Sequence, residues 1–157
     1  MSRSAVKFVH VTPSAVQHIA DNMRQADVDE VMASHGHTAH EAMTFSIRAS
    51  QLVSVVEIYD EPSCVVGLTA GKSTITRVGS PWMLGTDNIT KHRKIFVKSS
   101  PVVIEDMLHE CNLLSNYVHV KNHASIRWLK GLGFTIESPV EYGINEELFH
   151  PFYLRKK

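Results

Sequence analysis

A run of basic residues leads into a helix-start signal beyond the middle of the sequence. Basic side chains at 91–94 and at Lys98 are followed by Ser99, Ser100 and Pro101. Ser100 as N-cap and Pro101 in the first helical position predict that a helix begins here. Free amides at a helix N-terminus bind anions, and nearby cations strengthen the attraction. The junction is therefore a candidate anion site, and the plainer alternative is an ordinary capped helix after a solvated basic loop.

Four titratable side chains are candidates for acid–base chemistry. His119 lies in an alternating stretch that predicts a strand, and an imidazole with an ordinary pKa is a good base at neutral pH. Tyr117 shares its face if the strand is regular, which makes Tyr117 a candidate acid. Asp87 and Glu57 are the alternative bases. The competing interpretations are that His119 packs on the other face of the sheet and that Glu57 faces solvent.

Three histidines lie close together in the segment HGHTAH. Imidazoles two and three residues apart, as at His35, His37 and His40, can converge on one metal ion. No cysteine or carboxylate stands at a matching second spacing, so the sequence favours a solvated, pH-sensitive loop and predicts no metal site.

The segment that must position these groups is a predicted strand, turn and helix between Val118 and Phe134. Val118 and Val120 suit a buried strand, whereas Ile126 and Leu129 recur at helical spacing. Gly133 then suits the left-handed cap that ends a helix.

The remaining elements follow from alternation and from capping signals. A first strand within 5–13 passes into a helix with Thr12 as cap and Pro13 in its first turn. The other expected elements are helices at 27–34 and 38–49, a hairpin of strands at 53–60 and 63–72, a strand at 81–86, and a closing hairpin within 135–157. Together they predict one α+β domain spanning residues 1–157.

Composition narrows the class of protein. With 157 residues the chain can bury a core without a metal or disulfide, and Cys64 and Cys111 are expected to be buried thiols in a reducing compartment. A formal net charge of zero argues against an extended nucleic-acid footprint. No apolar run approaches the roughly 20 residues of a membrane span, so we expect a soluble, cytoplasmic protein with no nucleic-acid or membrane partner.

The spacing of the stretch from Asn122 to Phe134 resembles a motif of the GNAT superfamily of N-acyltransferases. Asn122, Ser125, Trp128, Gly133 and Phe134 match the pattern Asn-x-x-Ala-x-x-aromatic-Tyr-x-x-x-Gly-Phe, with serine in place of alanine. The wider stretch from residue 81 to residue 134 is most similar to a GNAT-like group of small tailed phages, some of them described as internal virion proteins.

The resemblance implies a fold and a cofactor. The fold would be α+β, with a mixed, mostly antiparallel sheet flanked by helices and a splayed strand pair forming a slot for acetyl-CoA or another acyl-CoA. Asn122, Ser125 and Trp128 would line that slot. The family's glycine-rich pyrophosphate loop is absent and VKSSPV stands there, so Lys98, Ser99 and Ser100 are the implied phosphate ligands.

The family's catalytic pattern is also incomplete in this sequence. Leu129 stands where many members have the tyrosine that protonates the departing thiolate. In similar enzymes a strand amide polarises the thioester carbonyl. His119 is then the implied base, with Asp87 and Glu57 as alternatives, and Tyr117 is the substitute acid.

Two functions from different classes remain. The first is a phage-encoded, acetyl-CoA-dependent N-acetyltransferase acting on a small host metabolite or a protein amine. The second is a GNAT-like domain that has lost catalytic activity. It would serve as a virion or assembly component, or as a binder of a host protein. In GNAT proteins the closing hairpin often borders the acceptor site or a dimer interface, which leaves room for a homodimer.

Overall fold

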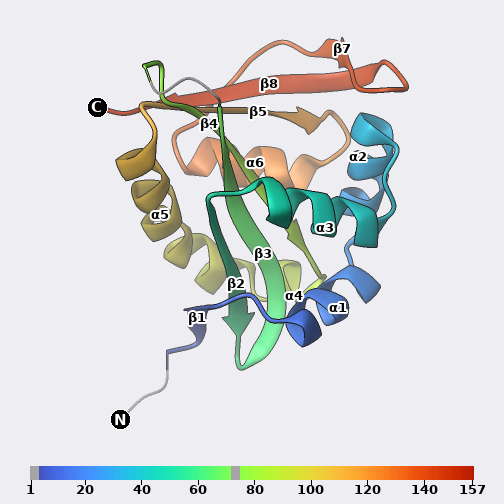
Figure 1. Ribbon diagram of the computed structural model, residues 1–157, viewed down its shortest axis with the longest axis vertical. Helices are drawn as coiled ribbons and strands as arrows, with labels where there is room; N and C mark the ends of the chain where they lie inside the picture. Colours follow the sequence, from blue (N-terminus) through green and yellow to red (C-terminus); the bar gives the residue numbers. More distant parts are fainter. Residues whose placement is uncertain (1–3, 72–74) are drawn as a thin grey trace.

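The structure, a computed structural model, describes residues 4–71 and 75–157 and contains one central sheet (Figure 1). The strand order is β1-β2-β3-β4-β5-β8-β6, with β7 also paired to β8. The strands are β1 (Val6–Val9), β2 (Leu52–Ile58), β3 (Glu61–Ala70), β4 (Val78–Gly85), β5 (Leu113–His119), β6 (Thr135–Ile136), β7 (Val140–Tyr142) and β8 (Glu147–Arg155). All these pairings are antiparallel except that of β4 with β5, which is parallel. The predicted α+β class is confirmed.

Helices cover both faces of the sheet. They are α1 (Pro13–Asp21), α2 (Gln25–His35), α3 (Ala39–Ala49), α4 (Asn88–Lys91), α5 (Arg93–Glu110) and α6 (His123–Gly131). Ile19 of α1 and Met43 of α3 pack on one face with Val65 of β3. Leu68 of the same strand faces the other way and packs with α5 and α6. The first three helices therefore lie on one face, and α5 and α6 lie on the other (Figure 1).

Local signals explain where most elements begin. The Thr12 hydroxyl accepts a hydrogen bond from the Ala15 amide, and Pro13 opens α1, as the sequence predicted. Thr38 and Glu41 form a reciprocal capping box at the start of α3. None of the helices in 4–71 and 75–157 is long and apolar enough to cross a membrane.

The predicted helix start at Ser100 is wrong. Helix α5 begins seven residues earlier, at Arg93, and continues through Pro101. A proline inside a helix removes one backbone hydrogen bond and costs about 3 kcal/mol. The hydroxyls of Ser99 and Ser100, just before the proline, donate to the carbonyls of Ile95 and Phe96 one turn earlier in the helix. Burial of Phe96, Ile104 and Met107 on both sides of the proline holds the helix together.

Strands β4 and β5 begin as a pair and then separate. Their parallel register holds only at Val78 with Leu113 and at Gly79 with Leu114. Beyond these rungs, β4 stays paired with β3 through Gly85, and β5 stays paired with β8 through His119. The splayed strand pair that the family resemblance implied is therefore present, and it consists of β4 and β5.

Gly67 on β3 makes room for a tryptophan beside the split. A Cβ at Gly67 would lie 2.5 Å from three indole atoms of Trp82, which is paired with it on β4. The Trp82 ring N–H donates to the Ser50 hydroxyl at 2.7 Å, which fixes the indole against the strand. The absence of a side chain at Gly67 therefore sets the position of Trp82.

We predict that Gly67→Ala destabilises the protein by about 1–3 kcal/mol, because the added methyl group overpacks the rigid indole. Urea denaturation compared with the wild type measures this loss. Gly131→Ala is the matched control, since a Cβ there meets no neighbouring atom, and we expect it to be neutral or slightly stabilising. Equal stability of the Gly67→Ala and Gly131→Ala proteins would contradict the packing argument.

Candidate active site

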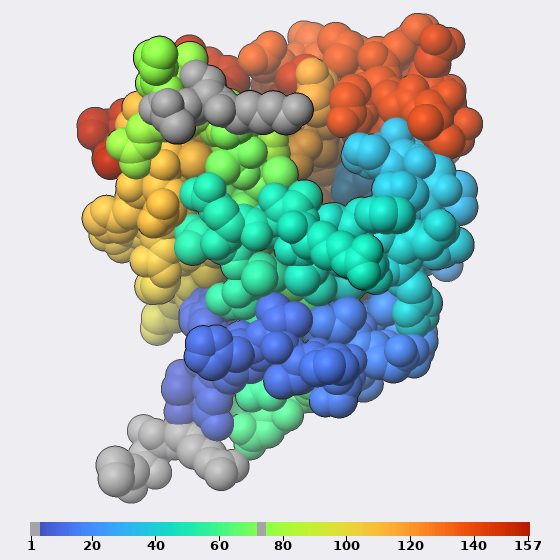
Figure 2. Space-filling view, in the orientation of Figure 1, coloured from blue at the N-terminus to red at the C-terminus, as the bar shows by residue number. Residues whose placement is uncertain are grey.

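A cavity of about 440 Å³ lies where β4 and β5 separate. Its walls come from α2 and α3 on one face of the sheet and from α5 and α6 on the other, so it passes between the two strands. On the face shown in Figure 2, the surface is hollowed between α3 and the C-terminal strands. A cavity through a split sheet can hold an extended ligand arm on one face and a second reactant on the other.

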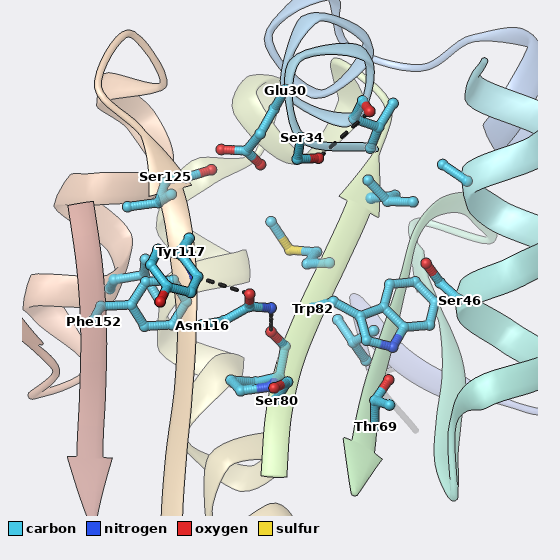
Figure 3. Close-up of a pocket in the computed structure, with 18 of the residues that line it drawn as sticks. Glu30, Ser34, Ser46, Thr69, Ser80, Trp82, Asn116, Tyr117, Ser125 and Phe152 are labelled. Carbon is cyan, nitrogen blue, oxygen red and sulfur yellow. Dashed lines mark hydrogen bonds between the residues drawn. The ribbon is translucent and has the colours of Figure 1, made fainter. Parts of the chain in front are cut away.

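The narrow end of the split is closed by Asn116 (Figure 3). Its side-chain amide donates to the Pro81 carbonyl at 2.8 Å, across the split. Its side-chain oxygen accepts from the Tyr117 amide at 2.8 Å. Asn116 thus replaces the next rung of the strand pair and satisfies backbone groups that face the gap.

The wide end is closed by the start of α2. The Arg24 amide donates to the Gly85 carbonyl at 2.8 Å, and the Gly85 amide donates to the Asp27 carboxylate at 3.1 Å. The Arg24 guanidinium donates to the Asn122 side-chain oxygen at 3.1 Å, and the Asn122 amide donates to Asp27 at 3.4 Å. All three side chains are buried. Desolvation raises the pKa of Asp27 even though the charge of Arg24 opposes the shift.

Between these two closures, the backbone of Met83 faces the open split. The Gly71 amide donates to the Val78 carbonyl, and the Thr86 amide donates to the Ser63 carbonyl. The backbone N–H and carbonyl groups of the even-numbered residues of β4 therefore point toward β3. Because strand groups alternate, the N–H and carbonyl of Met83 point toward β5, which does not pair with β4 at this position. Met83 therefore offers one donor and one acceptor to a ligand in the cavity.

Glu30 of α2 places a carboxylate on the cavity wall (Figure 3). One carboxylate oxygen accepts from the His119 main-chain amide at 2.7 Å. Burial raises the pKa of Glu30 to about 7, although that hydrogen bond opposes the shift. A carboxylate with this pKa can accept a proton at neutral pH.

Sequence reasoning missed Glu30, Arg24 and Asp27. They recur at intervals of three residues, a spacing that places charged groups on one face of α2. That spacing was the available signal, but a charged helical face is usually solvated, and only the tertiary structure turns this one inward.

The structure places the His119 ring away from the cavity. The ring contacts the Glu147 carboxylate at 2.9 Å through Nε2, and Nδ1 accepts from the Lys121 amide at 3.1 Å. Only the main-chain amide of His119 reaches the cavity wall, through Glu30. Tyr117 does line the cavity, with its ring stacked on Tyr142 at 3.9 Å between centroids.

The two alternative carboxylates lie outside the cavity. Glu57 is on β2, where it pairs with Lys7 and Pro62, and two strands separate it from the split. Asp87 is exposed at the turn before α4. Neither residue is therefore brought together with Tyr117 or with the Met83 backbone.

The predicted cofactor-binding residues fall into two groups. Ser125 and Trp128 line the cavity. Asn122, which was expected to line the slot, is instead buried at its wide end, where it is 2% exposed and bonded to Arg24 and Asp27. Lys98 and Ser99 lie within α5 rather than at its start, and neither lines this cavity.

Ser100 has a structural partner instead of a helix-cap role. Its hydroxyl accepts a hydrogen bond from the Trp128 ring N–H at 2.9 Å and ties α6 to α5. The anion site predicted at Lys98, Ser99 and Ser100 is therefore overturned, because no helix N-terminus exists there. The first turn of α5 instead carries Arg93 and Lys94, both exposed.

The histidine-rich segment borders the cavity. The rings of His35 and His37 stack at 5.6 Å, and His37 stacks on Phe45 at 4.8 Å. Residues 4–71 and 75–157 contain no group of three or more His, Cys, Asp or Glu side chains placed to hold a metal ion.

Solved structures with the same architecture include several acetyltransferases. No protein-family model matches the sequence, and no curated protein matches it. An acetyltransferase of the GNAT family from Streptococcus pneumoniae is 13% identical with a TM-score of 0.63, covering 97% of this chain and 99% of that one. The yncA protein of Salmonella typhimurium, solved with acetyl-CoA, is 14% identical with a TM-score of 0.70, covering 97% and 94%. A spermidine N-acetyltransferase SpeG chimera from Vibrio cholerae and hSSAT is 14% identical with a TM-score of 0.72, covering 97% and 96%.

The architecture is a mixed sheet with one split parallel strand pair, and helices cover both of its faces. The chain has the fold of the GNAT acetyltransferases. Identities of 13–14% support the fold and leave the activity to be argued from the site.

We predict that Glu30→Gln is more stable than the wild type at pH 8 by about 2–3 kcal/mol, and that the difference shrinks toward pH 4. The folded-state pKa of about 7 exceeds the ordinary value of 4.5, so the folded state binds the proton more tightly. The contribution of Glu30 to stability is therefore present below pH 4.5 and is lost as the pH rises through 7.

Urea denaturation at several pH values checks this prediction. Glutamine keeps the oxygen that accepts from His119, so the substitution removes the ionisation and retains the bond. Glu105→Gln, at an exposed position of α5, is the matched control and should leave the difference from the wild type independent of pH. A Glu30→Gln protein no more stable than the wild type at pH 8 would refute the buried-carboxylate interpretation.

Proposed function

We propose that this chain is an N-acetyltransferase that transfers an acetyl group from acetyl-CoA to an amine. The observation that carries the proposal is the split between β4 and β5, where the unpaired backbone of Met83 and the Glu30 carboxylate border one cavity. Polarising a carbonyl and removing a proton from an amine are the two tasks of acyl transfer.

The residues around the split fit an acyl-CoA. A pantetheine arm carries amide groups, which the N–H and carbonyl of Met83 can bind as a neighbouring strand would. Ser125 and Trp128 supply a hydroxyl and an apolar wall. The first turn of α5, with Arg93 and Lys94, suits the phosphates. When bound, the cofactor supplies the acetyl group as an activated thioester.

The proposed reaction assigns one task to each group. Glu30 accepts a proton from the acceptor amine, and the amine nitrogen attacks the carbonyl carbon of the thioester. The Met83 amide donates a hydrogen bond to the carbonyl oxygen as its negative charge develops. The carbon–sulfur bond then breaks to leave an amide, and Tyr117 is the candidate donor of a proton to the thiolate.

His119 takes a different part in this proposal from the one that the sequence suggested. Both of its ring nitrogens are occupied, whereas its main-chain amide binds Glu30. His119 would therefore position the base rather than act as one. The imidazole is kept as the alternative base, to be decided by the kinetic experiment below.

The acceptor and the biological setting are proposed from similarity. The likeness of residues 81–134 to phage GNAT-like proteins supports a phage-encoded enzyme in the host cytoplasm, acting on a small metabolite or a protein amine. Among the solved structures of the same fold are a spermidine N-acetyltransferase and an aminoglycoside acetyltransferase crystallised with ribostamycin. A homodimer or a host-protein partner is compatible with the fold.

A second candidate function rests on the closure of the wide end. Both backbone groups of Gly85 that face the split are bonded to Arg24 and Asp27 rather than being available to a cofactor. This observation, with the missing glycine-rich loop, favours a GNAT-like domain that has lost catalysis and serves as a virion or assembly component or a host-protein binder. Acetyl-CoA binding separates the two functions.

We predict that Arg93→Glu weakens acetyl-CoA binding by about tenfold or more, because a carboxylate at the start of α5 repels the phosphates. Lys98→Glu, five residues further along the same helix, is the matched control and should change the affinity little. Isothermal titration calorimetry measures both. No heat with the wild-type protein at millimolar acetyl-CoA would favour the non-catalytic function, and a larger effect at Lys98 would restore the sequence-based anion site.

We also predict that Glu30→Gln lowers kcat by about a hundredfold or more with little change in acetyl-CoA affinity. In the wild type, the rate of thiol release should rise with pH through about 7 as Glu30 loses its proton, and this rise should be absent from the variant. A pH–rate series on wild type, Glu30→Gln and His119→Gln decides the base. If the rise disappears only in His119→Gln, the base is His119.

A further inference from the structure

The half of the cavity on the α2 and α3 face is lined by aromatic and histidine rings and by one carboxylate. We propose that its ligand is a small monoamine, a single ammonium group carried on an aromatic or aliphatic body, rather than a polyamine or an aminoglycoside. This inference rests on the proposed transferase function for the reaction, but the walls themselves define the chemistry of the ligand.

The first argument concerns the charged side chains that line the cavity. Among the described residues that line the cavity, Glu30 is the one carboxylate, and none is a lysine or an arginine. An ammonium group moved out of water without an ionic partner is strongly disfavoured, because its desolvation is not compensated. The cavity can therefore compensate one positive charge well. A polycation would leave its other charges facing uncharged walls.

The second argument is the aromatic composition of those walls. Tyr117 and Tyr142 stack at 3.9 Å to form one flat wall beside β5. Trp82 stands on β4 across the split from Tyr117 (Figure 3). Flat rings on two sides bind an aromatic or aliphatic body by burial of apolar area, and their faces also attract a cation.

The third argument is the exposure of aromatic rings at this cavity. Phe45 is 52% exposed and Tyr117 is 39% exposed, although both line its walls. Exposed apolar groups gathered at a concave site mark a ligand-binding surface more often than isolated ones do. The ring of Phe45 lies on His37, so the apolar rim continues across the α2–α3 connection.

The walls are also held in place before a ligand arrives. Trp82 is fixed by Ser50 and by close contact with Gly67, and Tyr142 stacks on Tyr117 and makes a T-shaped contact with Phe149. Rings that are already immobilised lose little conformational entropy on binding, so their apolar area contributes more to affinity.

The test compares three probes that separate charge from apolar body. They are 2-phenylethylamine, which has both, 2-phenylethanol, which has the body alone, and spermidine, which has several charges separated only by short methylene chains. We expect calorimetry to show that 2-phenylethylamine binds at least about tenfold more tightly than either of the other probes, since neither of them can make both interactions well. In thiol release from acetyl-CoA, kcat/KM for 2-phenylethylamine should exceed that for spermidine by about tenfold or more.

Variants locate the binding. Phe45→Ala should raise KM for 2-phenylethylamine by about fivefold to tenfold with acetyl-CoA affinity unchanged, because it removes part of the apolar wall. Val102→Ala, an exposed apolar position on α5 and outside the cavity, is the control and should leave KM unchanged. An unchanged KM in Phe45→Ala would overturn the placement of the ligand.

The outcomes separate this inference from the proposed function. If spermidine equals or exceeds 2-phenylethylamine as a ligand or as an acceptor, the monoamine proposal is overturned and the transferase proposal still stands. Failure of 2-phenylethylamine to bind also overturns it. Absence of acetyl-CoA binding refutes the transferase, whereas tight, Phe45-dependent binding of 2-phenylethylamine would still support the ligand class.

Discussion

The separation of β4 from β5 is the constraint on which the rest of the site depends. Parallel strands normally continue to pair, because unpaired buried backbone groups are costly. Here, side chains replace the missing rungs, with Asn116 bonded to Pro81 at the narrow end and Asp27 bonded to Gly85 at the wide end. The strands can therefore stay apart with most of their facing groups satisfied, and the cavity between them is preserved.

The closure of the wide end also fixes where α2 lies. A buried charge is tolerated only when its bonding capacity is filled, and Asp27 is bonded to both Gly85 and Asn122. Within the described residues, every buried side-chain nitrogen and oxygen has a partner. Glu30 follows Asp27 by three residues on the same helix, so the anchoring of Asp27 delivers Glu30 to the cavity wall.

Local signals were sufficient to predict much of the fold. The cap at Thr12, the hairpin of β2 and β3, and the strand and helix around Asn122 depend on neighbours in sequence, and each was found near its expected place. The helix start at Ser100 failed because packing of α5 outweighed the proline, which is a tertiary effect.

The candidate site was harder to predict for the same reason. Strand alternation places His119 and Tyr117 on one face, but it cannot say which ring borders a cavity. Glu30, the carboxylate of the cavity wall, lies 89 residues from its partner His119, and no local pattern joins them.

The Gly85 bonds also limit how the cavity can hold a ligand. Of the β4 positions that face the split, Gly79 pairs with Leu114, the Pro81 carbonyl is bonded to Asn116, and Gly85 is bonded to α2. Met83 is thus the position within β4 that retains both a donor and an acceptor for an incoming group. Recognition along this strand must rely on one residue of backbone, and the remaining affinity must come from the surrounding side chains. Selectivity in such a site follows from the shape and charge of its walls more than from the strand itself.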